Sequence, residues 1–209
     1  MVVDTFQVGP LACNCTILGD EESGRAIVID PGDDAEQILD RITDHNLTLV
    51  AMIATHAHID HVSAVADLQD RSSATAAIHE KDLFLFEHLD AQADWLGVPH
   101  PSGGRIDRFL SDGDTVTSGG ISLDVLHTPG HTPGSVTFHM ESDRKVLFTG
   151  DTLFLRGVGR TDLWGGSMSD LMDSIRKRLL CFEDDALVIP GHGPSTTIGQ
   201  ERRENPFLR

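Results

Sequence analysis

The stretch Thr55-His56-Ala57-His58-Ile59-Asp60-His61 decides how this sequence folds and where its chemistry lies. It directly follows Leu47–Ala54, an apolar run typical of a buried strand. Four of its side chains carry atoms that bind first-row metals such as zinc, namely His56, His58, Asp60 and His61. A continuous helix would scatter them around its axis, whereas a strand that ends in a loop can aim the histidines at 56 and 58 one way and turn the later pair toward a neighbouring point. The stretch therefore predicts two adjacent metal ions rather than one.

Three later segments each end a predicted strand with one more possible ligand. They place His131 in the turn Thr128–Gly134, Asp151 after Thr149-Gly150, and His192 between the glycines of Pro190–Gly193. Glycine and proline make these turns stiff, and binding groups commonly lie on loops that a rigid scaffold holds. The three residues therefore join the first four as candidate ligands.

The spacing of apolar residues predicts strands and helices in both halves of the chain. The predicted strands are Val2–Val8, Ala12–Leu18, Arg25–Asp30, Leu47–Ala54, Thr75–His79, Ile121–His127, Ser135–Met140, Lys145–Thr149 and Ala186–Pro190. The predicted helices are Asp34–His45, His61–Gln69, Glu80–Leu96, Met168–Phe182 and Thr197–Glu204. Strands followed by helices in each half indicate an α/β fold with two packed sheets and helices outside, although periodicity alone fits other α/β folds as well.

The length and the net charge of the chain limit the classes of function that are possible. The 209 residues fit a single domain, residues 1–209. No apolar run reaches the roughly 18–20 residues that span a bilayer, and the start of the chain has no signal-peptide pattern, so we expect a cytoplasmic protein without a membrane role. A net charge of −17 repels phosphate backbones and disfavours nucleic acid as a partner. We therefore expect a small-molecule substrate.

The seven candidate ligands and the residues around them resemble the metallo-β-lactamase superfamily. Three runs are similar to its short, glyoxalase-II-like (hydroxyacylglutathione hydrolase-like) branch: Gly150-Asp151-Thr152-Leu153-Phe154, Gly159-Arg160-Thr161-Asp162 and Gly191-His192-Gly193-Pro194. The resemblance extends from Phe6 to Phe207 and implies a four-layer αββα sandwich. Full-length glyoxalase II enzymes also carry a helical C-terminal domain, which we expect this chain to lack because it ends 17 residues after His192.

The resemblance also implies a role for each ligand. His56, His58 and His131 would hold a first ion, Asp60, His61 and His192 a second, and Asp151 would bridge the two. The ions would be zinc, with iron or manganese as alternatives. Bound Zn²⁺ lowers the pKa of water from 15.7 to roughly 7, which makes hydroxide available at neutral pH, and Asp60 would orient it as the catalytic carboxylate.

The resemblance points to hydrolysis of a thioester such as S-lactoylglutathione. A thiol leaving group, with a pKa near ~8.5, needs little help from a general acid. Arg160 has two interpretations: it forms an ion pair with Asp162, or it binds an anionic group of the substrate. The oligomeric state is left open by the sequence.

Other functions fit parts of the same pattern. A persulfide dioxygenase with a single iron shares the run from Gly157 to Asp162, but the filled second site favours the hydrolase. A lactonase or another ester hydrolase could use the same core, because a fold does not determine its substrate. A metal-binding module without activity would leave the hydroxide-generating ligand set unexplained. Metal analysis combined with thioester and persulfide assays distinguishes these hypotheses.

Several conspicuous residues have structural interpretations. We interpret Cys13 and Cys15 as strand residues rather than as a metal pair, because no matching thiol pair exists elsewhere. We expect Asp30 to brace the metal-binding loops without contacting metal, and Trp95 and Trp164 to be packing residues.

Overall fold

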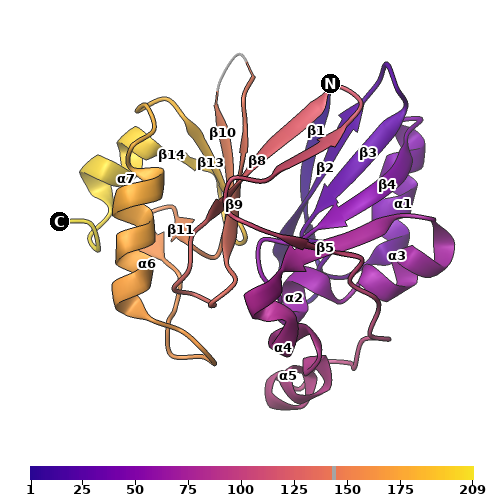
Figure 1. Cartoon of the computed structure of the whole chain (residues 1–209), viewed down its shortest axis with the longest axis horizontal. Helices are drawn as coiled ribbons and strands as arrows, with labels where there is room; N and C mark the ends of the chain where they lie inside the picture. The colour runs from indigo at the N-terminus through magenta and orange to yellow at the C-terminus, as the bar shows by residue number, and fades with distance from the viewer. Residues whose placement is uncertain (143–144) are drawn as a thin grey trace. The chain divides into compact units, whose positions relative to one another are not determined.

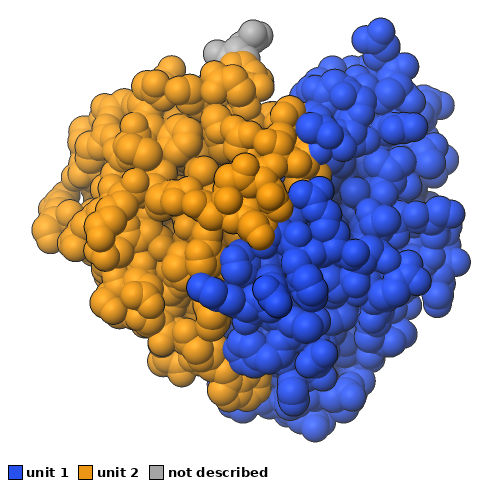
Figure 2. Space-filling view, viewed as in Figure 1, with its two compact units in different colours: residues 1–110, 117–121 blue, residues 111–116, 122–209 orange. Residues whose placement is uncertain are grey.

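The computed structural model describes residues 1–142 and 145–209. These residues form two units, residues 1–110 with 117–121 and residues 111–116 with 122–209, which Figure 2 shows in different colours. The expectation of one domain over residues 1–209 stays a prediction.

The first unit is built on a six-stranded sheet in the order β1-β2-β3-β4-β5-β6. Its strands are β1 (Val2–Val8), β2 (Cys13–Asp20), β3 (Arg25–Ile29), β4 (Thr48–Ile53), β5 (Thr75–His79) and β6 (Arg108–Leu110). Its helical segments are α1 (Ala35–Asp44), α2 (Ile59–Val62), α3 (Val65–Arg71), the 3₁₀ turn η1 (Glu80–Asp82), α4 (Leu83–Phe86) and α5 (Leu89–Leu96). The first three strands are antiparallel, and β3 to β6 run parallel.

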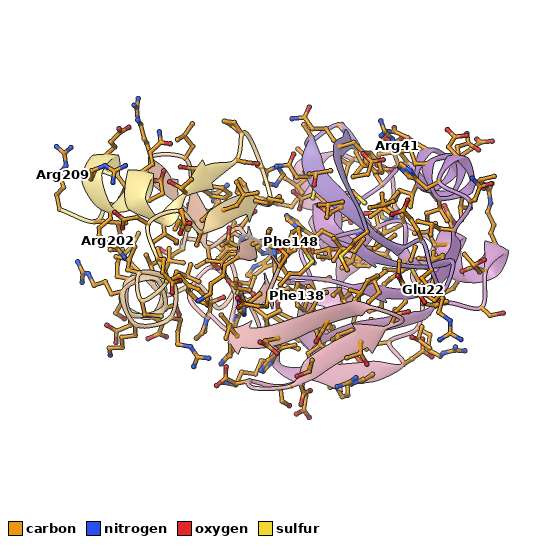
Figure 3. The ribbon with its side chains drawn as sticks, turned by 90° about the horizontal axis from the view of Figure 1, so that it is seen from above. Glu22, Arg41, Phe138, Phe148, Arg202 and Arg209 are labelled. Carbon is orange, nitrogen blue, oxygen red and sulfur yellow. The ribbon has the colours of Figure 1, made fainter. Side chains whose placement is uncertain are left out.

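Helices α1 and α3 lie together on one face of this sheet (Figure 1). Ile38 and Ile42 of α1 are buried among strand residues such as Val28 and Met52. On the outer side of α1, Arg41 (Figure 3) reaches back to β1 and donates twice to the carboxylate of Asp4, at 3.1 and 3.0 Å. The helix is thus fixed to the sheet by both its apolar and its polar face.

The second unit contains a six-stranded sheet in the order β14-β13-β10-β9-β8-β7 and a small hairpin, β11-β12. The strands are β7 (Thr115–Ser118), β8 (Ile121–His127), β9 (Val136–Met140), β10 (Val146–Gly150), β11 (Leu153–Phe154), β12 (Gly157–Val158), β13 (Leu187–Pro190) and β14 (Thr196–Thr197). The helical segments are α6 (Met168–Ser174), the π-helix η2 (Ile175–Leu179) and α7 (Ile198–Glu204).

The core of the second unit lies between its helices and the sheet. Helices α6 and α7 cover one face, as Figure 1 shows, and bury Leu171 and Ile198 against Val188 of β13. Phe138 and Phe148, labelled in Figure 3, are buried and pair in register across β9 and β10, but they lie on the face of the sheet opposite to Leu147 and the helices.

Both sheets place candidate ligands at the carboxyl ends of parallel strands, except for His131, which follows β8, a strand antiparallel to β9. In the first unit, β3 and β4 are parallel with Ile29 opposite Ile53, so Asp30 and Thr55 emerge side by side. In the second, β10 and β13 are parallel with Gly150 opposite Pro190, so Asp151 and His192 follow at the same edge. Loops at this edge of a parallel sheet are the usual place for ligand groups.

The structure corrects three sequence-based predictions. The helix predicted over Glu80–Leu96 is divided into η1, α4 and α5, because His88 leaves the helical conformation with φ −119° and ψ 32°. The helix predicted over His61–Gln69 is two short helices, α2 and α3. Trp95 and Trp164 are 56% and 48% exposed, so neither is the buried packing residue that the sequence suggested. Trp95 lies outside the face of α5 that buries Leu89, Gln92 and Ala93.

Within the described residues, none of the helices combines the length and the apolar character that crossing a membrane requires.

Candidate metal centre

The first unit brings together the four candidates that follow β4. His56, His58 and His61 are buried, and the ring centroid of His56 lies 4.8 Å from that of His58 and 4.0 Å from that of His61. The Asp60 carboxylate lies 3.8 Å from His61 Nε2. The structure therefore brings three imidazoles and one carboxylate together in this unit, and their division between two ions stays a prediction.

Asp30 holds two of these imidazoles in a defined orientation. Its carboxylate accepts hydrogen bonds from the backbone N–H of Thr55 at 2.6 Å and from Thr55 Oγ1 at 2.8 Å, and it lies 3.0 Å from His61 Nδ1. Because the hydroxyl hydrogen of Thr55 goes to Asp30, Oγ1 accepts from His56 Nδ1 at 3.1 Å. Both rings thus carry their proton on Nδ1 and present Nε2 as a lone-pair donor. The prediction that Asp30 braces the loops is confirmed by these bonds.

Two further side chains hold the same loop, and sequence reasoning missed both. Asp82 is buried and accepts from the backbone N–H of Ala57 at 3.1 Å. Gln92 of α5 accepts from the backbone N–H of Ile59 at 3.0 Å and donates to the Ala57 carbonyl at 3.3 Å. These contacts join residues 25 to 35 positions apart, so no local pattern announces them.

A close backbone approach beneath Asp60 requires glycine at position 32. A Cβ added to Gly32 would lie 1.8 Å from the carbonyl oxygen of Asp60, far inside van der Waals contact. The Pro31 carbonyl accepts from the backbone N–H of Ala64 at 3.0 Å. The Asp30-Pro31-Gly32 turn therefore supports the ligand loop from below.

Cys13 lies beside this cluster, with Sγ 3.6 Å from His61 Nδ1. Burial raises the pKa of its thiol to about 12, so the group is neutral at pH 7. Cys13 and Cys15 are both buried in β2 as free thiols, which agrees with their interpretation as strand residues.

The second unit brings together its own three candidates. Asp151 Oδ2 lies 3.6 Å from His131 Nε2, and Asp151 Oδ1 lies 3.8 Å from His192 Nε2. Each carboxylate oxygen therefore faces a different imidazole. His131 Nδ1 donates to the carbonyl of Arg160 at 2.8 Å, which again leaves Nε2 as the lone-pair donor.

The carbonyl that orients His131 is placed by tight packing and by α7. A Cβ added to Gly159 would lie 1.8 Å from the Asp151 carbonyl oxygen, so this backbone position has no room for any residue other than glycine. Glu201 of α7 is fully buried and accepts from Thr196 Oγ1 at 2.6 Å and from the backbone N–H of Arg156 at 2.7 Å. Asn205 donates to the Gly157 carbonyl at 3.0 Å. Helix α7 thereby fixes the hairpin β11-β12, which leads directly into Arg160.

Arg160 forms the ion pair that the sequence suggested as one of two interpretations. Its Nε and Nη2 donate to the two oxygens of Asp162 at 2.7 and 2.8 Å. The hydrogen bond from Arg160 lowers the pKa of Asp162 to about 2. Both side chains are more than half exposed, so the pair is accessible to a solute.

These two clusters fit first-row metal ions by the chemistry of their atoms. They offer five imidazoles and two carboxylates, a set that suits zinc, iron or manganese. The three rings with assigned Nδ1 partners have the orientation that ligating histidines adopt in metal sites, with Nδ1–H given to a carboxylate, carbonyl or hydroxyl.

Comparison with known proteins gives a consistent result. A family model described as the metallo-beta-lactamase superfamily matches residues 8–192. The hydroxyacylglutathione hydrolase GloC of Haemophilus influenzae is 43% identical over 210 residues, which cover 100% of this chain and 98% of that protein.

Two crystal structures resemble this chain over nearly its whole length. One is BLEG-1, a B3 metallo-beta-lactamase, with a TM-score of 0.91 and 36% identity over 99% of both chains. The other is TTHA1623 in a di-iron-bound form, with a TM-score of 0.90 and 39% identity over 99% of this chain and 100% of that one.

Proposed function

Because this chain belongs to the metallo-beta-lactamase superfamily, we propose that it is a dinuclear metal-dependent hydrolase of thioesters such as S-lactoylglutathione. The α/β fold of that superfamily, predicted from the sequence, is confirmed by the solved structures that resemble it. The thioester substrate is our proposal, and the 43% identity to GloC supports it.

We propose that all seven candidates are metal ligands. His56, His58 and His131 would hold one ion, Asp60, His61 and His192 the other, and Asp151 would be shared. Zinc is the first choice of metal, and iron is supported by the di-iron form of TTHA1623.

The observation that carries the proposal is the position of Asp151. Its two oxygens face His131 and His192 separately, at 3.6 and 3.8 Å, and this is the arrangement expected of a carboxylate shared between two ions.

In this proposal, the residues around the ions have separate roles in the hydrolysis. A pair of bound first-row ions supplies hydroxide at neutral pH and polarises the carbonyl under attack. Asp60, whose side chain is 18% exposed, would orient the nucleophile by accepting its hydrogen bond. Asp30 and the Arg160 carbonyl would keep the imidazoles oriented throughout, so no ligand has to reorganise during the reaction.

Metal analysis of the purified protein tests the dinuclear part. We expect close to two ions per chain by elemental analysis, together with thioester hydrolysis that a chelator abolishes and metal restores. A firm ratio of one ion, with full activity retained, would contradict the dinuclear site. Oxygen consumption on glutathione persulfide without thioester hydrolysis would instead identify a persulfide dioxygenase, and lactone hydrolysis alone would identify a lactonase.

Arg160 tests how an anionic substrate is bound. Its guanidinium is the exposed cation that follows directly on the Gly159 turn, and we propose that it contacts a substrate carboxylate. Arg160→Ala should raise KM about tenfold for glutathione thioesters and much less for thioesters of neutral thiols, with kcat less affected. An equal change in KM for both thiol classes would show that Arg160 does not contact a substrate carboxylate and serves only in the ion pair with Asp162.

Partners and location follow from charge and cysteine chemistry. We propose a small-molecule substrate and no nucleic-acid partner, since a net charge of −17 repels phosphate backbones. The three cysteines are free thiols, which supports a reducing, cytoplasmic location.

A further inference from the structure

A cavity of about 220 Å³ opens in the first unit, and Asp60 forms part of its wall. The rest of the wall comes from the turn after β1 (residues 8–11), from Gly32 and Asp33, from Ser63 and Asp67 beside Asp60, and from the loop 98–102. At roughly 30 Å³ for each water-sized group, the cavity holds about seven non-hydrogen atoms. That is the size of one half of a small substrate.

The walls of this cavity are held in place by hydrogen bonds and close packing within the unit. The backbone N–H of Gly9 donates to Asp34 at 2.8 Å, and the side chain of Asp33 packs against Gly9 so closely that an added Cβ would lie 2.8 Å from it. On the other side, His100 lies 3.1 Å from Asp90 and 3.0 Å from Asp94, which anchors the loop to α5. A cavity with fixed walls binds a small group without having to order them first.

The surface of the cavity is apolar with a negative rim. Leu11, Ile59 and Val98 supply apolar surface, together with prolines of both loops. Asp33 and Asp67 supply carboxylates that are not assigned to a metal ion, and among the described lining residues there is no Lys or Arg. The His100 imidazole lies between two carboxylates, so it adds no net positive charge. An anionic group in the cavity would therefore be repelled by the carboxylates of Asp33 and Asp67.

We infer that this cavity is the acyl subsite of the enzyme, and that it takes small uncharged or cationic acyl groups and rejects acyl groups that carry a carboxylate. The inference rests on the proposed thioester hydrolysis. The thiol half of a glutathione thioester is anionic, so of the two halves only the acyl group is compatible with this rim. Acyl groups of about two to six non-hydrogen atoms match the volume.

A series of glutathione thioesters with one thiol and different acyl groups tests the charge selection. We expect kcat/KM to be similar for acetyl, lactoyl and butyryl thioesters, equal or higher for the cationic β-alanyl thioester, and about tenfold lower for the succinyl thioester, which adds a negative charge near the carboxylates. Equal rates for butyryl and succinyl thioesters would overturn the inference.

A matched pair of charge reversals on α3 locates the effect. Asp67 lines the cavity, whereas Asp70 is exposed on the same helix outside it. Asp67→Lys should raise the succinyl-to-butyryl ratio of kcat/KM about tenfold, while Asp70→Lys should leave that ratio within about twofold of wild type, because solvent screens the more distant charge. The same gain in both variants would show a general charge effect and overturn the subsite.

A binding measurement separates the subsite from the reaction. In amide NMR spectra of the ¹⁵N-labelled protein, butyramide should shift the resonances of Gly9 and Gly32, and succinamate should not. Thioester hydrolysis without these shifts would overturn the subsite and leave the proposed function standing. Hydrolysis of no thioester at all would overturn the proposed function, and the acyl assignment with it.

Discussion

Replacing Asp151 by alanine should abolish hydrolysis while the protein stays folded. We expect kcat/KM to fall about a thousandfold or more, which corresponds to roughly 4 kcal/mol of transition-state stabilisation. The reason is that the two oxygens of Asp151 face two different imidazoles, His131 and His192, so one substitution disturbs both proposed ions. The measurement is steady-state kinetics combined with elemental analysis of the same preparation.

Two other variants make this prediction specific. His192→Ala removes one proposed ligand of one ion, so it should retain more metal and more activity than Asp151→Ala. Asp173→Asn removes an exposed carboxylate of α6 that pairs with Lys177, and it should behave as wild type. Wild-type turnover in Asp151→Ala, or a loss no larger than that in His192→Ala, would show that Asp151 is not shared between two ions.

The sequence located the residues that the two clusters bring together because each lies where a local signal is strong. An apolar run that ends in a histidine or an aspartate indicates a polar loop at a strand end, as at His56, Asp151 and His192, and a glycine precedes the last two. The parallel pairing of β3 with β4 and of β10 with β13 then brings the ends of distant segments together. Parallel pairing itself was not visible in the periodicity, which is the same for many α/β folds.

The residues that hold the ligands were largely invisible in the sequence. Three side chains accept hydrogen bonds from backbone N–H groups 25 to 45 positions away in the sequence, namely Asp82, Gln92 and Glu201. The residues next to them in the sequence give no sign of these contacts. Glu201 has the spacing of an ordinary polar helix residue, yet it is fully buried. Short strands such as β6 and β14, with three and two residues, were missed because they are too short to show alternation.

The largest effect on stability is expected from Asp30→Ala. Asp30 is 2% exposed and receives three hydrogen bonds, from the backbone and the hydroxyl of Thr55 and from His61. Alanine would leave these buried donors without their acceptor, at about 1–3 kcal/mol for each group that stays unsatisfied. Alanine also tolerates the φ of +53° at this position less well than aspartate does. The free energy of unfolding should therefore fall by roughly 3–5 kcal/mol.

Asp34→Ala is the matched control for the backbone. Asp34 has nearly the same conformation, with φ +51°, but it is exposed, so its replacement tests the strain of alanine without a buried network. At about 2–4 °C per kcal/mol for a chain of this size, Asp30→Ala should lower Tm by about 10 °C or more, and Asp34→Ala by only a few degrees. Equal losses in the two variants would assign the effect to backbone strain alone.

Asp30→Asn then separates the hydrogen bonds from the metal chemistry. Asparagine adopts the left-handed region readily and keeps one carbonyl acceptor, so it should recover part of the stability that alanine loses. Its NH₂ group must face either the backbone N–H of Thr55 or the pair formed by Thr55 Oγ1 and His61 Nδ1, and the neutral amide holds the Nδ1 proton of His61 less strongly than a carboxylate does. Metal affinity should consequently fall by about 10–100-fold in a variant that still folds, as is usual when the partner of a ligating histidine is removed. Wild-type metal affinity in folded Asp30→Asn would mean that Asp30 braces the loop backbone and does not orient the imidazoles.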